Sequence, residues 1–114
     1  MIKEIFPDII ISYPSISIVG SSVSEDPKDF YYPFILQLEE IAKNWNEIIF
    51  NFKYDYYNTA SYMYLTRIMK ILAETSKIKE VKINWYYLAN DENLLEIGED
   101  LAEFYKVPIK LIKR

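Results

Sequence analysis

Histidine and cysteine are both absent from this sequence of 114 residues. Without them the chain has no imidazole base, no thiol nucleophile and none of the usual zinc or haem ligands. A metal site here could use oxygen ligands only, as Mg²⁺ and Ca²⁺ do, and no loop shows a calcium-binding pattern. We therefore predict no catalytic residue, no metal and no cofactor. The lack of cysteine also fits a reducing compartment.

Glycine, basic residues and long apolar runs are scarce as well. The only two glycines, Gly20 and Gly98, stand far apart, so no glycine-rich loop exists to hold nucleotide phosphates. There are 13 basic against 17 acidic residues, a net charge of −4, which argues against a nucleic-acid partner. No apolar run approaches the ~18 residues that span a bilayer, and Pro7-Asp8 interrupts the first apolar stretch. We expect a cytoplasmic protein without a membrane partner.

What is present is typical of a globular chain. Apolar residues make up 51% of the sequence and aromatic residues 17%, with eleven tyrosines among them. This composition can fill one modest core and does not indicate disorder. We expect one domain that covers residues 1–114.

The clearest pattern lies between residues 46 and 76. Alternate apolar residues predict a strand over 46–57 with one buried row: Ile48, Phe50, Phe52, Tyr54 and Tyr56. From Tyr62 the apolar spacing becomes helical. Between them lies the polar corner Asn58-Thr59-Ala60-Ser61, where Asn58 or Thr59 would cap the helix.

The remaining pattern predicts alternating strands and helices. Strands are expected over 9–11, 15–19, 81–87 and 107–112, with Pro108 at an edge or a strand start. One helix should begin at Asp26-Pro27 and kink or restart at Pro33, and another should begin at Asn90-Asp91-Glu92. The inner stripe expected for that last helix is Leu94, Ile97, Leu101 and Phe104, and Gly98 on the same face would allow it to approach the sheet closely.

Short strand–helix–strand steps predict parallel neighbours. Parallel strands covered on both faces read as unbroken apolar runs, whereas these strands alternate. We therefore predict a two-layer α/β domain: a mixed sheet of about five strands, with three helices mainly on one face. The other face would carry Asn51, Lys53, Asp55, Tyr57, Lys82, Asn84 and Tyr86.

The polar corner has two readings. Asn58-Thr59 could serve only as a helix cap, which these residue types favour. Alternatively, Thr59 is a phosphoacceptor, because a helix N-terminus tolerates a phosphate and the added charge would act on a docked partner.

Tyrosines and acidic residues near this corner also have two readings. Tyr57 and Tyr62 flank it, and they either pack at a half-buried sheet margin or form a protein-binding surface. Glu96 and Glu99 belong to an acidic helix that is either solvated or a docking surface for a basic partner.

Several segments together resemble the SiaC family of bacterial regulatory phosphoproteins. They are Ser21 to Glu25, Phe30-Tyr31, Tyr56 to Ser61, Ile83 to Tyr87 with Asp91-Glu92, and Glu96 to Asp100. The resemblance covers roughly residues 15 to 112. It implies a STAS-like fold, similar to the anti-sigma-factor antagonists, and a partner-switching protein that is not itself an enzyme.

The resemblance also implies the partners and the site. The family's phosphothreonine corresponds to Thr59, preceded by the matching Asn58. A serine/threonine kinase of the histidine-kinase-like ATPase type would phosphorylate it, and a PP2C-type phosphatase would restore it. The unphosphorylated form would bind and regulate a diguanylate cyclase, which links the chain to cyclic-di-GMP and biofilm control.

Two positions depart from the family pattern. Ala60 stands where serine is usual, and Met63 where a basic residue is common, so a cation contact to the phosphate is lost there. We expect the partner surface to include Tyr57, Asn58, Ser61, Tyr62, Met63, Glu96 and Glu99. The alternatives are an interaction module in which Asn58-Thr59 only caps the helix, and a small carboxylate-dependent enzyme.

Overall fold

The computed structural model describes residues 3–114, and strands and helices alternate along them. The strands are β1 (Asp8–Ser12), β2 (Ser15–Ser22), β3 (Glu47–Tyr57), β4 (Glu80–Tyr87) and β5 (Ile109–Lys113). The helices are α1 (Lys28–Asn44), α2 (Thr59–Thr75) and α3 (Glu92–Tyr105).

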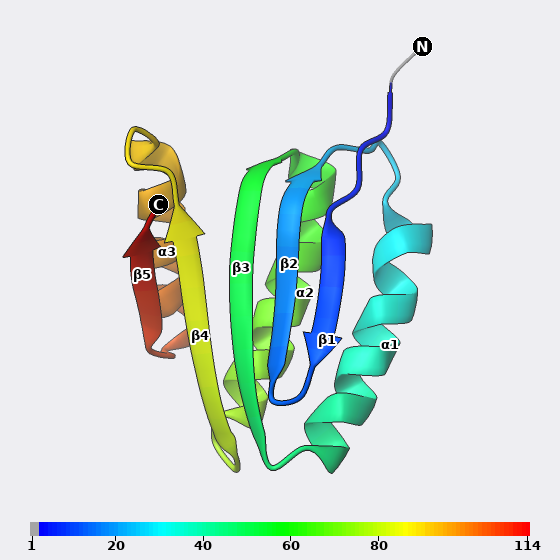
Figure 1. Ribbon diagram of the computed structural model, residues 1–114, viewed down its shortest axis with the longest axis vertical. Helices are drawn as coiled ribbons and strands as arrows, with labels where there is room; N and C mark the ends of the chain where they lie inside the picture. The colour runs from blue at the N-terminus through cyan, green and yellow to red at the C-terminus, as the bar shows by residue number, and fades with distance from the viewer. Residues whose placement is uncertain (1–2) are drawn as a thin grey trace.

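The five strands form one sheet in the order β1-β2-β3-β4-β5. β1 is antiparallel to β2, and every later pair is parallel. Each parallel step crosses through one helix, and right-handed crossovers between successive neighbours place all the helices on one face. Figure 1 shows α2 and α3 behind the strands and α1 beside β1, at the right of the view. The two-layer mixed fold predicted from the alternation is confirmed.

The core lies between the sheet and the helices. The strands bury one row of side chains toward the helices: Ile16, Ile18, Ile48, Phe50, Phe52, Tyr54, Ile83 and Trp85. The central helix α2 covers this row with Leu65, Ile68, Met69 and Leu72, all fully buried.

The opposite sheet face carries a polar row. Ser17, Asn51 and Asn84 are paired in register across three strands. The Asn51 Nδ2 donates to Ser17 Oγ at 3.1 Å, and Asn84 Nδ2 donates to Asn51 Oδ1 at 2.8 Å. Beside this row, Lys53 Nζ lies 4.8 Å from the centroid of the Tyr86 ring. Because polar side chains occupy this face, the strands alternate instead of reading as continuous apolar runs.

A bulge near the end of β3 reverses the inward and outward directions. Gly20 pairs with Tyr54, but the next residue, Ser21, pairs with Tyr56, so β3 has an extra residue at this point. Since side chains alternate along a strand, Tyr56 turns outward and is 60% exposed, and Tyr57 turns toward the helices. The predictions that placed Tyr56 in the buried row and Tyr57 on the open face were wrong for this reason.

The start of α1 also differs from the prediction. Pro27, rather than Asp26, occupies the cap position, and no side chain caps the helix. The Asp26 backbone N–H instead donates to Ser24 Oγ at 3.2 Å. The helix then runs through Pro33 as one element.

The start of α3 and the role of Gly98 are as predicted. Asp91 Oδ1 accepts from the Leu94 backbone N–H at 2.9 Å and caps the helix. A Cβ atom added at Gly98 would lie 2.6 Å from Trp85 Cδ1 and 2.8 Å from Leu111 Cδ2. Glycine is therefore needed for the close approach of α3 to β4 and β5.

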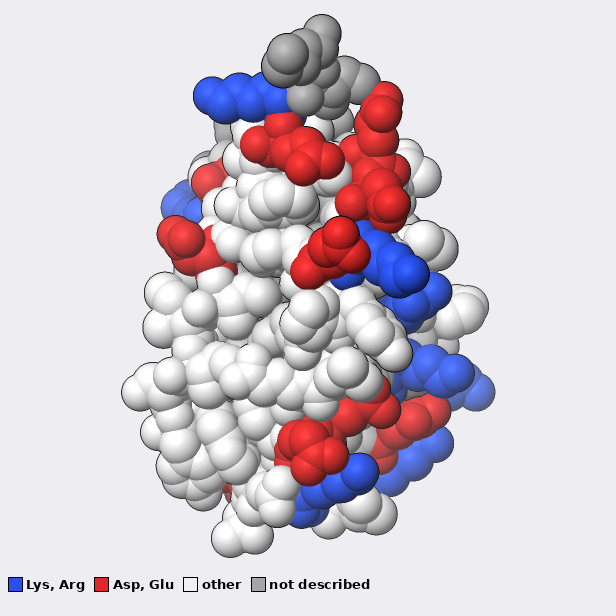
Figure 2. Space-filling model, turned by 90° about the vertical axis from the view of Figure 1, so that its right-hand side faces the viewer, with Lys and Arg blue, Asp and Glu red and all other residues white. Residues whose placement is uncertain are grey.

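Figure 2 shows the side formed by β1 and α1, where uncharged side chains occupy much of the centre. Large exposed apolar residues of this side include Ile10, Tyr32 and Leu36. Within residues 3–114, no helix combines the length and the apolar character needed to cross a membrane.

Candidate functional site

Asn58 joins the end of β3 to the start of α2 and ties both to β2. Its Oδ1 accepts from the Ser61 backbone N–H at 3.1 Å, which makes it the N-cap of α2. Its Nδ2 donates to the Ser24 carbonyl at 2.7 Å, and its backbone N–H donates to the Ser22 carbonyl at 3.1 Å. Of the two cap residues that the sequence left open, the structure uses Asn58.

Thr59 is the first residue of α2, and its side chain is exposed. Among the residues that the structure describes, its hydroxyl makes no hydrogen bond, because the cap is supplied by Asn58. The hydroxyl is therefore accessible at a helix N-terminus, where a negative charge is favoured.

Ser61, two residues later, has a different environment. It is 1% exposed, and its hydroxyl donates to the Ser22 carbonyl at 3.0 Å while accepting from Ser22 Oγ at 2.8 Å. Ser22 Oγ also lies 2.6 Å from the Tyr31 hydroxyl, which lies 3.0 Å from that of Tyr54. Burial raises the pKa of both tyrosines. Ser61 thus belongs to a buried hydroxyl network, and the expectation that it contacts a partner is corrected.

The two tyrosines that flank the corner stack on each other. The ring centroids of Tyr57 and Tyr62 are 5.7 Å apart. The Tyr57 hydroxyl is buried without a hydrogen-bond partner in the described part of the chain, and desolvation, followed by the proximity of Tyr62 and Asp91, raises its pKa. Burial also raises the pKa of Tyr62, which is half-buried, whereas the neighbouring Met63 is 50% exposed. Tyr62 and Met63 are open to a partner.

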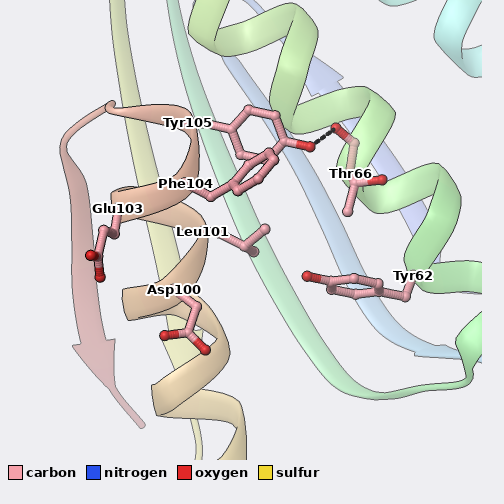
Figure 3. Close-up of a pocket in the computed structure, with 7 residues that line it drawn as sticks. All are labelled: Tyr62, Thr66, Asp100, Leu101, Glu103, Phe104 and Tyr105. Atoms are coloured by element: carbon pink, nitrogen blue, oxygen red, sulfur yellow. Dashed lines mark hydrogen bonds between the residues drawn. The ribbon is translucent and has the colours of Figure 1, made fainter.

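A groove of ≈ 670 Å³ separates α2 from α3, and we call it the α2–α3 groove. Figure 3 shows that side chains from the two helices face each other across it. The Tyr105 hydroxyl spans it and donates to the Thr66 carbonyl at 3.3 Å. The lining residues are Tyr62, Thr66, Asp100, Leu101, Glu103, Phe104 and Tyr105.

Phe104 was expected in the inner stripe of α3, but it is 76% exposed. It lies at the last turn of α3, on the side that faces the groove, while its neighbour Tyr105 packs against the core and Val107 beyond it is buried. The helical spacing identified α3 correctly but could not show which residue of this turn faces the core.

Glu96 and Glu99 are both exposed on α3, as expected. Neither lines the groove itself, but each lies one turn before an acidic residue that does: Glu96 before Asp100, and Glu99 before Glu103. Sequence reasoning treated the two as one stripe and missed the groove between the helices.

The site offers surfaces and a free hydroxyl rather than converging reactive groups. Within residues 3–114, no three acidic side chains lie close enough together to share a metal ion. The tyrosine hydroxyls near the corner have raised pKa values, so they stay protonated and are poor general bases at neutral pH. This arrangement suits recognition and modification.

Comparison with known proteins gives one family and one fold. A family model described as SiaC family regulatory phosphoprotein matches residues 7–114. Comparison with curated proteins finds no match.

Among solved structures, the chain is similar to a chain of the crystal structure of diguanylate cyclase SiaD in complex with its activator SiaC from Pseudomonas aeruginosa. The TM-score is 0.89 at 20% identity, covering 98% of this chain and 95% of that chain. The crystal structure of apo-SiaC from the same organism gives a TM-score of 0.84 at 20% identity, covering 96% and 93%. At these identities the structural likeness shows the fold.

The family match covers nearly the whole of the described chain, and the topology agrees with the solved SiaC structures. The regulatory, non-enzymatic character expected from the sequence agrees with the family description. The chain belongs to the SiaC family of regulatory phosphoproteins.

Proposed function

We propose that this protein is a phosphorylation-controlled partner switch. Unmodified, it binds and regulates a signalling enzyme, for which a diguanylate cyclase is the best candidate. Phosphorylation of Thr59 weakens that complex. The observation that carries the proposal is the hydroxyl of Thr59, which is exposed and makes no hydrogen bond to any residue of 3–114, beside Asn58, whose side chain caps the helix.

The start of α2 can carry a phosphate without unfolding. The first N–H groups of a helix lack intrahelical partners, and the dipole favours negative charge there. Asn58 satisfies the Ser61 N–H, while the N–H groups of Thr59 and Ala60 remain at the open end. A phosphate adds about −1.5 to −2 charges, so its main effect falls on a bound partner.

Support for a target enzyme comes from the family and a solved relative rather than from this chain alone. The family description names a regulatory phosphoprotein, and the solved relative SiaC is described as the activator of diguanylate cyclase SiaD. For the present chain we infer a histidine-kinase-like serine/threonine kinase, a PP2C-type phosphatase and a cyclase target in the cytoplasm. The pathway would then act through cyclic-di-GMP on biofilm formation.

The partner surface that we propose surrounds the corner and extends onto α3. It comprises Tyr57, Asn58, Tyr62, Met63, Glu96 and Glu99, and Ser61 is excluded by its burial. The departures at Ala60 and Met63 from the family pattern bear on the choice of kinase and target.

The competing function is an interaction module in which the corner only caps the helix. Asn58 already fills that role, so Thr59 is not required for it. Phosphopeptide mapping after incubation with the cognate kinase separates the two functions. We expect label on Thr59 and none on a Thr59→Ala variant; label on Ser61, or none in this corner, would refute the assignment.

Binding of the target tests the switch itself. Thr59→Ala should bind the cyclase as the wild type does, because Asn58 still caps α2 and the fold is kept. Thr59→Glu should weaken binding, though less than true phosphate, since it carries one charge and fewer acceptor oxygens. A tenfold weaker complex corresponds to about 1.4 kcal/mol, which titration calorimetry resolves. Equal affinity of the phosphorylated and unmodified proteins would contradict the switch.

A further inference from the structure

Thr59 lies on the same face of α2 as the residues that line the α2–α3 groove. Thr59, Tyr62, Thr66, Lys70 and Ala73 follow one another at steps of three or four residues, which places them in one stripe. The proposed modification site therefore stands at one end of the groove.

The groove continues beyond its first hollow. A second hollow of ≈ 450 Å³ shares Phe104 and Tyr105 with it and adds Lys70, Ala73 and Glu74 of α2. From Tyr62 to Glu74 the path is about 18 Å long at 1.5 Å per residue. That length matches about three turns of a helix lying against α2.

Aromatic and apolar side chains form the contact surface inside this path. Phe104 is 76% exposed, and its ring centroid is 4.9 Å from that of Tyr105. Leu101 lies below them, buried at the base of the groove. Exposed aromatic side chains next to a hollow are the usual anchors of protein interfaces.

The charges on the rim define what would fit. Asp100 and Glu103 line the groove, and Glu96 precedes Asp100 by one turn on the same side of α3. The sequence of α3 contains no lysine or arginine. The opposite side carries both signs, because Lys70 and Lys77 line the second hollow together with Glu74. An occupant would therefore need basic side chains toward α3.

We propose that the α2–α3 groove docks an amphipathic helix of the regulated enzyme, about three turns long. Its apolar stripe covers Leu101 and Phe104, and its basic flank lies along Glu96, Asp100 and Glu103. A groove between two helices accepts a third helix by the same packing that joins helices elsewhere. This inference rests on the proposed function, since it specifies which segment the partner presents.

The orientation follows from helix dipoles. The N-terminus of α2 carries a partial positive charge, so it favours the C-terminal, negative end of an antiparallel helix. That end would then lie beside Thr59, where a phosphate repels it. The apolar side formed by β1 and α1 is bordered by charged side chains of both signs, so it does not favour an occupant of one charge.

Two designed peptides of about 14 residues test the docking. Both carry leucines at helical spacing; one has lysines along one flank, and the other has glutamates there. Each is titrated into the full chain, with fluorescence anisotropy for affinity and backbone amide chemical shifts for location. We expect the lysine peptide to bind at least tenfold more tightly and to shift resonances of α2 and α3.

Adjacent acidic residues provide a matched control. Asp100→Lys should remove or reverse the preference for the lysine peptide, whereas Glu99→Lys should change either affinity by a clearly smaller factor, because Asp100 lines the groove and Glu99 does not. Phe104→Ala should weaken both peptides about fivefold or more.

Three results of the peptide experiments would overturn the docking proposal. They are no saturable binding of either peptide at millimolar concentration, shifts confined to the β1 side or the open sheet face, or equal effects of Asp100→Lys and Glu99→Lys. A dimer in sedimentation that Phe104→Ala dissociates would also overturn it, because a second copy would then cover the groove. If Thr59 is phosphorylated but no peptide binds, the docking proposal fails and the phosphorylation switch stands. If a peptide binds but Thr59 is not phosphorylated, the switch fails and the docking proposal stands.

Discussion

Replacing Asn58 should reveal how strongly the corner is held. Its side chain makes two hydrogen bonds: Oδ1 accepts from the Ser61 N–H at 3.1 Å, and Nδ2 donates to the Ser24 carbonyl at 2.7 Å. The first bond caps α2, and the second fastens the helix to the segment that follows β2. Asn58→Ala removes both, so it should cost more than an ordinary cap.

The two bonds set the expected magnitude. Loss of an N-cap side chain costs about 0.5–2 kcal/mol, and a further hydrogen bond contributes about 0.5–1.5 kcal/mol. Together they predict that Asn58→Ala lowers the free energy of unfolding by about 1–3.5 kcal/mol. Asn58→Asp keeps the acceptor and places a negative charge at the helix N-terminus, but it loses the donor to Ser24. It should lose about half as much.

Urea denaturation followed by far-ultraviolet circular dichroism measures both variants. The order wild type, Asn58→Asp, Asn58→Ala is expected, with similar slopes of free energy against urea. An Asn58→Ala variant within 0.5 kcal/mol of the wild type would refute the two-bond reasoning. If Asn58→Asp is as stable as the wild type, the hydrogen bond to Ser24 contributes nothing. If Asn58→Asp is as unstable as Asn58→Ala, the cap contributes nothing.

Three further predictions concern the core. Gly98→Ala should lower the free energy of unfolding by about 1–2 kcal/mol, because its Cβ would lie 2.6 Å from the buried Trp85 ring. This overpacking outweighs the roughly 1 kcal/mol gained in helix propensity. A more stable variant in urea denaturation would contradict the prediction. Tyr57→Phe should leave stability unchanged or raise it by up to about 1 kcal/mol, since the Tyr57 hydroxyl is buried without a partner among the described residues. Tyr54→Phe should lose about 1 kcal/mol, because it loses the hydrogen bond to Tyr31. Equal losses of stability in thermal melts would refute the distinction. Burial raises the pKa of Tyr31, Tyr54 and Tyr57, so the unfolded chain releases these protons at lower pH than the folded chain does. Their contribution to stability should be complete below about pH 10 and should fall as the pH rises further. Unfolding free energies that stay level from pH 8 to pH 11.5 would contradict this prediction.

Local sequence patterns determined the elements of this fold. The alternation of apolar and polar residues in β2, β3 and β4 identified strands with one covered face, and this led to a two-layer sheet. The polar corner before α2 and Asp91 before α3 marked the helix starts. These signals depend on a side chain and neighbours within about four residues, so the sequence carries them directly.

Only the tertiary structure separated the two hydroxyls of the corner. Thr59 and Ser61 are equivalent by residue type, but Ser61 is buried by Ser22, a residue 39 positions earlier in the chain. The bulge opposite Gly20 and Ser21 likewise reversed Tyr56 and Tyr57. Both outcomes depend on the register between β2 and β3, which neither strand specifies alone.

The groove and the exposed Phe104 also arise from packing between elements. Helical spacing places Phe104 near the inner stripe of α3, yet which residue of the last turn meets the core depends on how α3 packs, and Tyr105 rather than Phe104 packs there. The sequence by itself determined the strands, the helices and the corner, because their signals lie within single turns and strands. The tertiary structure decided which hydroxyl is free and where a partner could dock, because those depend on contacts between residues far apart in the chain.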